Sequence, residues 1–386
     1  MRYRFVGTLM MMGGLLLSSS NMYAATRSRS KDKCIQTKPC PKPKKCPPKV
    51  KNPCDDLLGK GPGYANYDLK CGYSAPARIN PHCGWDIALS ASFIYWHASQ
   101  EGMDFAIYDT GTTPTNTVGL VFQKFDFEPG FKVAASSYLG TDDWTGTVEY
   151  TRLHFSNNES SFAPTTTNGA LYSNNYSDDS DITAIALRDT LTQAKSRWQC
   201  DLDVIDVETA RWMYLGQMLT AAPFMGARGG FLDQRFNVSN LLASGTTFLR
   251  NKHRSKSWFV GPRMGLDMNW ILGYGIRASG SFAGSLLYQR QRARFDIENS
   301  ASSTYTNGLV KNTYRHVRSN TELALGLGWG MYPMEEFHFD VFAEYIFQQF
   351  EGQNVNRTNV DSLSGSFSSP GNLSYHGLTF TAKVDF

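Results

Sequence analysis

The chain has 386 residues, of which 41% are hydrophobic and 19% charged, and its formal net charge is +4. By these averages it resembles an ordinary soluble protein. In addition, no window after the N-terminus holds 18 consecutive apolar residues, which excludes helical membrane spans. The aromatic share of 13%, with Gly and aromatic residues spread through the last 300 positions, favours an all-β chain of many strands.

Residues 1–25 are interpreted as an export signal. Arg2 and Arg4 precede the apolar stretch "FVGTLMMMGGLLL", and "MYAA" suits cleavage near Ala24 or Ala25. The alternative is a membrane anchor, but the apolar run is shorter than the ~20 residues that a spanning helix needs. We therefore expect this segment to be removed and to carry no information on the fold.

Residues 26–83 form a Cys/Pro/Lys-rich segment that we predict to be periplasmic and largely disordered. Residues 26–60 hold eleven Lys or Arg against three Asp, and the prolines favour extended, polyproline-like backbone. The rest of the chain is net acidic once the signal is removed. A basic tail on an acidic body suits an anionic envelope surface better than a nucleic acid, and a plain solvated spacer is the alternative.

Six of the seven cysteines lie in this segment, and none of them is two to four residues from another. This spacing excludes zinc pairs and Cys-x-x-Cys redox chemistry, whereas an oxidising compartment favours disulfides. We predict intermolecular disulfides for the first four and leave a local pair open for the last two. The predicted disulfide cysteines are Cys34, Cys40, Cys46, Cys54, Cys71 and Cys83. Cys200 is the candidate unpaired thiol.

From residue 84 onward the chain alternates with a period of two. At the C-terminus, Val384, Phe380 and Leu378 share one face, and Lys383 and Thr381 share the other. Such alternation indicates strands with one apolar and one polar face. We predict ten of them: 84–98, 118–140, 143–156, 195–210, 218–238, 255–270, 273–294, 314–332, 336–350 and 373–386.

A β-sandwich would show the same period, so two further features decide the architecture. Trp and Tyr gather at the ends of the apolar faces, as at lipid interfaces. The connections also alternate in length, because those near 141, 211–217, 271 and 333–335 are short, whereas those at 99–117, 157–194, 239–254, 295–313 and 351–372 are long. Short periplasmic turns and long outer loops are typical of outer-membrane barrels. We therefore predict a transmembrane antiparallel β-barrel over residues 84–386.

The strand count depends on residues 118–140. Pro129–Gly130 resembles a turn, but Val121, Phe131 and Val133 all fall on odd positions, which indicates one unbroken apolar face. We prefer one long strand with a bulge, giving ten strands. Twelve strands is the alternative.

The stretches "YTRLHF", "GARGGFLDQRF", "WFVGPRMGLDMNW" and "SFAGSLLYQR", in this order, resemble the major outer membrane protein family first described in Legionella, which also has members in chlamydia-related bacteria. The similarity covers residues 84 to 386. It implies an abundant outer-membrane barrel with porin-like activity and surface roles in host contact. It transfers no catalytic residue, and it says little of residues 26–83.

The polar strand faces would line the interior, because a charge facing lipid at mid-membrane costs about 2–4 kcal/mol. Ten strands lie close to the eight that side chains fill completely, so the lumen should be narrow. We expect passive solute diffusion, with a mainly structural or adhesive barrel of narrow or closed lumen as the alternative. The predicted pore-lining residues are Lys124, Asp126, Glu128, Lys132, Arg228, Arg263, Asp267, Arg277, Glu322, Asp340, Glu344 and Lys383.

We expect no enzyme activity, cofactor or metal site. The sequence has no Gly-x-Ser-x-Gly or His-Glu-x-x-His motif, and its histidines at the outer strand ends are more simply explained as rim residues in water. These are His97, His154, His253, His316 and His376. The expected partners are outer-membrane lipid, other envelope proteins linked by disulfides, host-surface ligands at the long loops, and a second copy of the chain, but no nucleic acid.

Overall fold

A computed structural model describes residues 76–79, 86–110, 118–140, 143–163, 169–173, 190–242, 248–299, 308–334, 337–354, 358–359, 366–367 and 371–386. Within these ranges no helix is long and apolar enough to cross a membrane. The six predicted disulfide cysteines and residues 1–75 lie outside the described residues.

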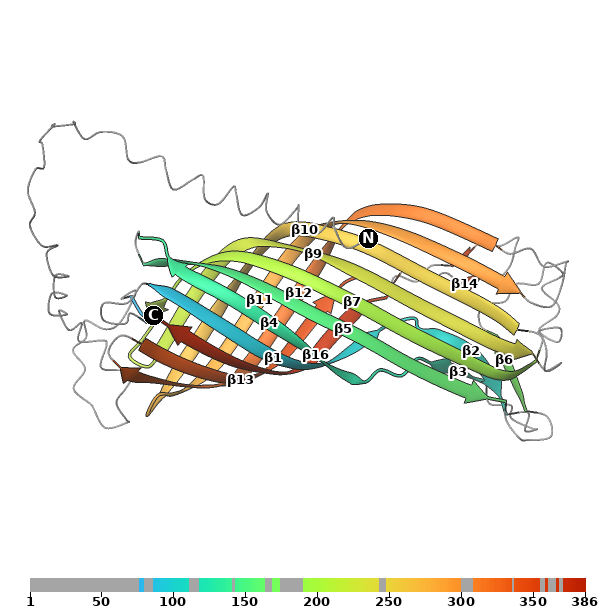
Figure 1. The fold of residues 1–386 in the computed structure, drawn as a ribbon, viewed down its shortest axis with the longest axis horizontal. Coiled ribbons are helices and arrows are strands. Elements are labelled where there is room, and N and C mark those ends of the chain that lie inside the picture. Colours follow the sequence, from blue (N-terminus) through green and yellow to red (C-terminus); the bar gives the residue numbers. More distant parts are fainter. Residues whose placement is uncertain are drawn as a thin grey trace, which may run out of the picture. The chain divides into compact units, whose positions relative to one another are not determined.

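Ten strands form one closed antiparallel barrel (Figure 1). They follow the order β10-β11-β12-β13-β16-β1-β4-β5-β7-β9, and pairing of β9 with β10 closes the ring. The barrel strands are β1 (Ile87–Gln100), β4 (Phe127–Tyr138), β5 (Trp144–Phe162), β7 (Leu191–Arg211), β9 (Leu219–Leu242), β10 (Phe248–Gly273), β11 (Ile276–Asn299), β12 (Gly308–Met334), β13 (Phe337–Phe350) and β16 (Leu373–Asp385). The predicted fold and the count of ten strands are confirmed.

Six shorter strands complete the structure. β8 (Met213–Tyr214) pairs with β9, and β14 (Thr358–Asn359) pairs with β15 (Ser366–Phe367). β2 (Asp104–Asp109), β3 (Val118–Phe122) and β6 (Ala170–Ser173) form a separate three-stranded sheet. Met103, Phe105 and Leu171 of this sheet region belong to the same buried apolar core as the barrel interior. The small sheet therefore packs on the barrel at the end where the long connections lie.

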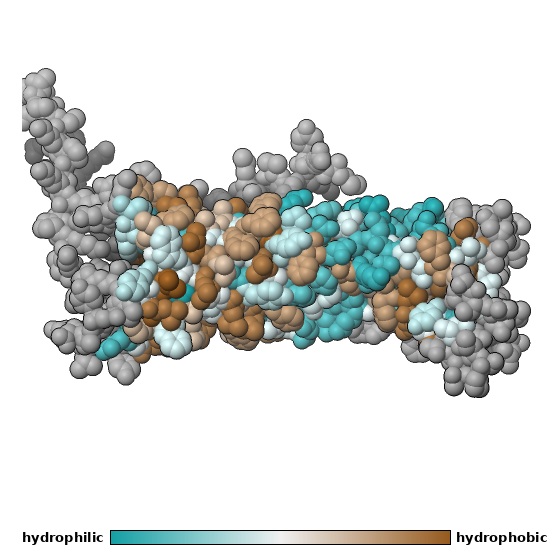
Figure 2. Space-filling view, turned by 90° about the horizontal axis from the view of Figure 1, so that it is seen from below, coloured by the Kyte–Doolittle hydropathy of each residue, from teal (hydrophilic) through white to brown (hydrophobic). Residues whose placement is uncertain are grey.

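An outward apolar band marks the membrane-spanning part of the barrel. On β10 the side chains of Trp258, Met264 and Trp270 are exposed and alternate with the inward Arg263 and Asp267. Trp258 and Trp270 bound this band at its two edges, as interfacial aromatic residues do. Figure 2 shows apolar side chains gathered over the half of the barrel that carries the short turns, and a hydrophilic zone beyond them.

Beyond this band the polarity of the two faces reverses. On β7, Lys195 and Arg197 are exposed and alternate with Trp198, Cys200 and Leu202, each at most 1% exposed and facing inward. A strand with a polar outer face and an apolar inner face suits water outside and a packed core inside. The outer surface of the barrel is thus apolar, as in a membrane protein, near the short turns, and polar, as in a soluble barrel, at the other end.

The prediction of one strand over 118–140 was wrong. β3 ends at Phe122, β4 begins at Phe127, and the two strands belong to different sheets. The alternation also changes phase, because the exposed residues of β3 are even-numbered and those of β4 odd-numbered. The buried side chain of Gln123 accepts a hydrogen bond from Ser196 of β7 at 2.6 Å, and its backbone N–H bonds to Met103. These bonds hold the break in the strand against the barrel wall.

Two of the predicted long loops are mostly strand. Residues 239–242 belong to β9 and 248–254 to β10, and β11 and β12 extend through most of 295–313. β9 to β12 have 24 to 27 residues each, more than twice the roughly 9–11 that cross a bilayer. Their extra length forms the part of the barrel that lies beyond the apolar band.

Candidate functional site: the barrel interior

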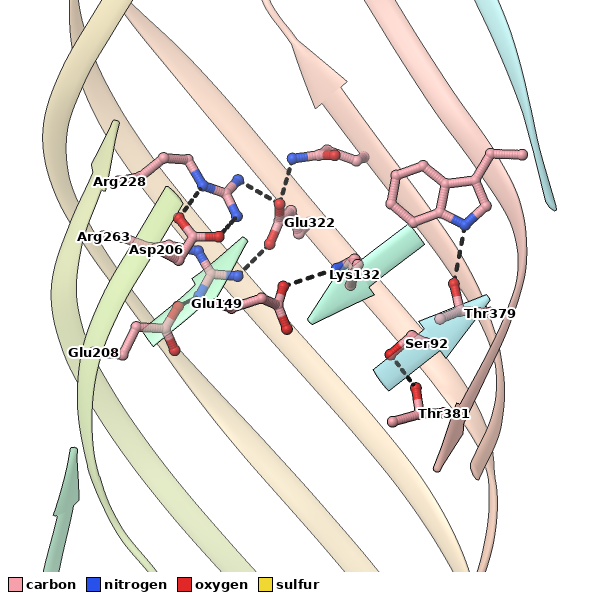
Figure 3. Close-up of polar contacts among 12 residues, drawn as sticks. Ser92, Lys132, Glu149, Asp206, Glu208, Arg228, Arg263, Glu322, Thr379 and Thr381 are labelled. Carbon is pink, nitrogen blue, oxygen red and sulfur yellow. Dashed lines mark hydrogen bonds and ion pairs between the residues drawn. The ribbon is translucent and has the colours of Figure 1, made fainter. Parts of the chain in front are cut away.

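A layer of ion pairs lies across the interior at mid-height (Figure 3). Arg228 of β9 is 3% exposed and donates two hydrogen bonds to Asp206 of β7, both at 2.7 Å. It also pairs with Glu322 of β12, and Glu322 pairs with Arg263 of β10, which contacts Glu208. We call these five residues the mid-barrel cluster. It joins strands that are not neighbours in the barrel, so its charges meet across the lumen.

The alternation brings most of the predicted interior charges together. Lys132 bonds to Glu149 at 3.1 Å beside the mid-barrel cluster, Asp267 accepts from Ser281 at 2.6 Å, and Glu344 accepts from Ser279 at 2.8 Å. Glu149, Asp206 and Glu208 were not predicted. Glu149 and Glu208 lie on polar faces of predicted strands and could have been found by extending the same period to β5 and β7.

Two predicted residues lie elsewhere. Lys124 and Asp126 belong to the segment between β3 and β4 and not to a barrel strand. The Lys124 side chain is 79% exposed and pairs with Glu159, so its placement in the lumen was wrong. Glu128 is half-buried on the same inward-facing row of β4 as Lys132, but it does not line the polar cavity described below. Whether the remaining predicted residues line a solute path stays a prediction.

A second group of interior charges lies near the short-turn end. Arg277 pairs with Asp340 at 2.6 Å, Lys383 pairs with Asp385 at 2.8 Å, and His338 contacts Asp385 at 3.1 Å. Potential ligand atoms of His338, Asp340 and Asp385 lie within 4.8 Å of one another, which a metal ion could bridge. Each of the two carboxylates also has a cationic neighbour, Arg277 beside Asp340 and Lys383 beside Asp385.

A polar cavity of about 420 Å³ extends from the mid-barrel cluster to the short-turn end, and the second group of charges lines part of it. Nine carboxylates and five cationic side chains line it. Its wall reaches Arg78, Tyr138 and Phe386 at the short-turn end and Glu322 and Trp96 at mid-height. The cavity is therefore an acidic vestibule whose upper boundary is the mid-barrel cluster.

Above the cluster, aromatic rings cross the lumen. Trp198 of β7 lies 6.3 Å from Phe155 of β5, Phe155 lies 5.5 Å from Tyr375 of β16, and Tyr375 lies 6.1 Å from Phe350 of β13. Phe350 then lies 5.7 Å from Phe259 of β10. Two strands lie between β16 and β5 in the barrel order, and two lie between β10 and β13. We call these five rings the aromatic bridge, and two of its contacts span the lumen between strands that are not neighbours.

The interior glycines do not reopen this space. A Cβ atom added to Gly226 or Gly261 would lie 2.0 or 1.9 Å from a backbone carbonyl oxygen of the neighbouring strand. At Gly265 the added atom would lie 2.3 Å from the ring of Phe224. Glycine at these positions allows close strand approach and leaves room for an aromatic side chain.

The predicted rim histidines are not one site. His97 and His376 face each other on β1 and β16 with ring centroids 4.9 Å apart, and His154 pairs with Asp201 on the outer face of β5 and β7. His253 is buried beyond the apolar band, where its ring lies 4.3 Å from that of Phe295. Cys200 is a buried free thiol whose sulfur lies 3.4 Å from the Tyr375 hydroxyl.

Replacing Arg228 with Met should lower the free energy of unfolding by about 3–5 kcal/mol, because it leaves the buried Asp206 and Glu322 without their shared cation. Arg152→Met is the matched control. Arg152 pairs with Asp203 on the outer face and its side chain is 58% exposed, so its loss should cost less than about 1 kcal/mol. Urea unfolding followed by tryptophan fluorescence measures both, and equal losses would contradict the role of the cluster.

Burial lowers the pKa of His253 from 6.5 to about 3. The unfolded chain therefore binds a proton between these values that the folded chain does not, and stability falls as pH decreases below about 6.5. From pH 7.5 to pH 5.5 the wild type should lose about 1.4 kcal/mol more than His253→Phe. Urea midpoints of both proteins at the two pH values measure this difference, and a parallel decline would contradict it.

Comparison with known proteins places the chain in a family. A family model described as "Legionella pneumophila major outer membrane protein precursor" matches residues 80–386. No curated protein matches the chain.

Among solved structures, the outer membrane protease OmpT from Escherichia coli is similar at 10% identity, with 80% of this chain and 99% of that chain covered and a TM-score of 0.41. A Pseudomonas aeruginosa FadL homologue is similar at 8% identity, with 78% and 89% covered and a TM-score of 0.23. The Pseudomonas putida toluene transporter TodX is similar at 7% identity, with 85% and 98% covered and a TM-score of 0.18. The family match, which spans the whole barrel, shows that this chain belongs to the Legionella major outer membrane protein family and is an outer-membrane β-barrel.

Proposed function

We propose that this barrel is a structural protein of the outer-membrane surface whose lumen does not conduct solutes in the conformation described. The observation that carries the proposal is the aromatic bridge, which links five rings from β7 to β10 through centroid distances of 5.5 to 6.3 Å. Rings packed this closely leave no room for a water molecule between them.

Two further layers support a closed lumen. Below the bridge, the mid-barrel cluster places five charged side chains across the interior. Above it, Met103, Phe105 and Leu171 continue the apolar core into the small sheet. A solute would have to separate ion pairs and then cross an apolar layer. The interior is therefore better suited to stabilising the barrel than to transporting solutes.

Passive diffusion remains the competing function. The acidic vestibule of about 420 Å³ could admit small cations from the short-turn end, and a path would exist if the aromatic bridge moved aside. The strand number argues against this, because a ten-stranded barrel is close to the size that its own side chains fill.

Planar-bilayer recordings separate the two functions. The wild type should give no steady conductance steps, whereas Phe155→Ala/Trp198→Ala/Tyr375→Ala should give openings, because it removes three consecutive rings of the bridge. The control Phe131→Ala/Phe282→Ala/Phe380→Ala removes three exposed rings from the lipid-facing side and should stay silent. Steady steps from the wild type, unchanged in the lumen variant, would overturn the proposal.

We also propose that the segment 26–83 anchors the barrel covalently to other envelope proteins. Its support is the sequence pattern, in which cysteines are interspersed with prolines and lysines in a segment expected to lie in an oxidising compartment. Cys200, in contrast, is buried in the barrel core and is suited to remain reduced.

Non-reducing gels of isolated envelopes test the anchor. High-mass bands should collapse to the monomer when a thiol reductant is added, and they should be lost in the variant with Ser at Cys34, Cys40, Cys46 and Cys54. Cys200→Ser should keep them. A wild type that runs only as a monomer without reductant would refute the crosslinking role.

A further inference from the structure

On three neighbouring strands, a cation follows directly after the last apolar residue of the outward face. Lys256 precedes Trp258 on β10, Arg290 follows Tyr288 on β11, and Arg315 precedes Val317 on β12, and each cation lies two positions further from the membrane band. All three apolar residues are exposed. These cations therefore lie at the edge of the bilayer on the long-loop side, at the depth of lipid headgroups.

Outward cations also lie directly opposite one another across strand pairs. In the register, Arg254 pairs with Arg294, Lys256 with Arg292, and Arg290 with Arg315. Arg235 faces Arg254, and Lys311 faces Arg294. We call these residues the basic sector: Arg235, Arg254, Lys256, Arg290, Arg292, Arg294, Lys311 and Arg315.

Like charges directly opposite in a sheet are destabilising, so the basic sector needs a counter-charge. Asp233 supplies some of it, since it contacts Arg235, Arg254 and Lys256 at 3.3 to 3.4 Å. Asp296 pairs with Arg294 at 2.7 Å. Among the residues that the structure describes, Arg290, Arg292, Lys311 and Arg315 contact no carboxylate.

The Nε atom of Arg290 is buried and has no hydrogen-bond partner within the described part of the chain. The positive charge at the band edge is thus larger than the protein itself neutralises.

The same strands pair opposite charges further from the membrane. Lys252 faces Asp296, and Arg250 faces Glu298, both on β10 and β11. Lys252 and Glu298 form an ion pair. The excess of cations is therefore confined to the rows next to the apolar band and is not a general property of the solvated wall.

The other side of the barrel differs. On β7 the outward residues just beyond the band are Asp203 and Asp201, which pair with Arg152 and His154 of β5. β1 and β16 carry His97 and His376 there. The basic sector is thus restricted to β9 through β12, as a localised site would be.

We propose that the basic sector binds the phosphorylated headgroup of a lipid of the outer leaflet. Guanidinium groups bind phosphate oxygens through two hydrogen bonds at once, and clustered Lys and Arg at a membrane edge attract anionic lipid. The acyl chains of such a lipid would lie on Val260, Leu286 and Tyr288, which are exposed just below the cations. Headgroup and chains would therefore both find a complementary surface on β10 and β11.

The test uses the full mature chain refolded in a phosphate-free neutral detergent and titrated with bisphosphorylated lipid A. Native mass spectrometry reports the bound lipid. The variant Arg290→Gln/Arg315→Gln removes two cations without a carboxylate partner among the described residues, and affinity should fall about 25-fold, at about 5-fold for each charge. The control Arg250→Gln/Lys252→Gln removes the same charge from the compensated rows of β10 and should change affinity less than about 3-fold.

Three further probes identify the ligand: dephosphorylated lipid A, inorganic phosphate and a soluble acidic polysaccharide. Lipid A without its phosphates should bind about as weakly to the wild type as the intact lipid binds to the double variant, and inorganic phosphate alone should not compete at millimolar concentration. A retained shift in gel mobility on heating shows that each variant is folded. Equal binding of dephosphorylated lipid, an unchanged double variant, or full competition by free phosphate or by a soluble acidic polysaccharide would each overturn the proposal. None of these outcomes depends on whether the lumen conducts.

Discussion

The closure of ten strands into one barrel determines most other features of this protein. In a bilayer every backbone N–H and C=O group must be bonded within the protein, and pairing of β9 with β10 leaves the barrel without an edge. Ten strands also fix the width of the interior near the limit that side chains fill. The interior is therefore narrow, and the aromatic bridge and the mid-barrel cluster are two ways in which side chains occupy it.

The mid-barrel cluster is charged and the aromatic bridge is apolar because lipid surrounds the barrel wall at the height of the first and water at the height of the second. Where lipid surrounds the wall, the strands expose Met264 and Phe282, and a strand with two apolar faces would aggregate before insertion. Polar inner residues such as Arg228 and Glu322 avoid this, at the cost of burying charges that must be fully paired. Where water surrounds the wall, Trp198 and Leu202 can face inward because the outer face supplies the polarity.

This change of solvent along the strands explains which parts of the structure the sequence could predict. In the membrane band the period of two identifies the inward residue with little ambiguity, as for Arg263 and Asp340. Beyond the band an apolar residue can face either way, and the polar outer residues of β9 and β10 at 239–242 and 248–254 resemble a loop. The partners of Arg228 could not be predicted, because pairing across a lumen depends on strand tilt and curvature that no local pattern encodes.

The break at 123–126 shows the same limit. Alternation continues on both sides of the break, so the sequence alone favours a single strand. Only the change from even to odd outward positions separates β3 from β4. That change matters because it releases β3 into the small sheet, whose neighbour β2 contributes Phe105 to the core above the aromatic bridge. A barrel with a continuous strand here would lack this cover. The four irregular residues therefore help to place Phe105 over the aromatic bridge, and the uninterrupted local alternation gives no sign of this connection.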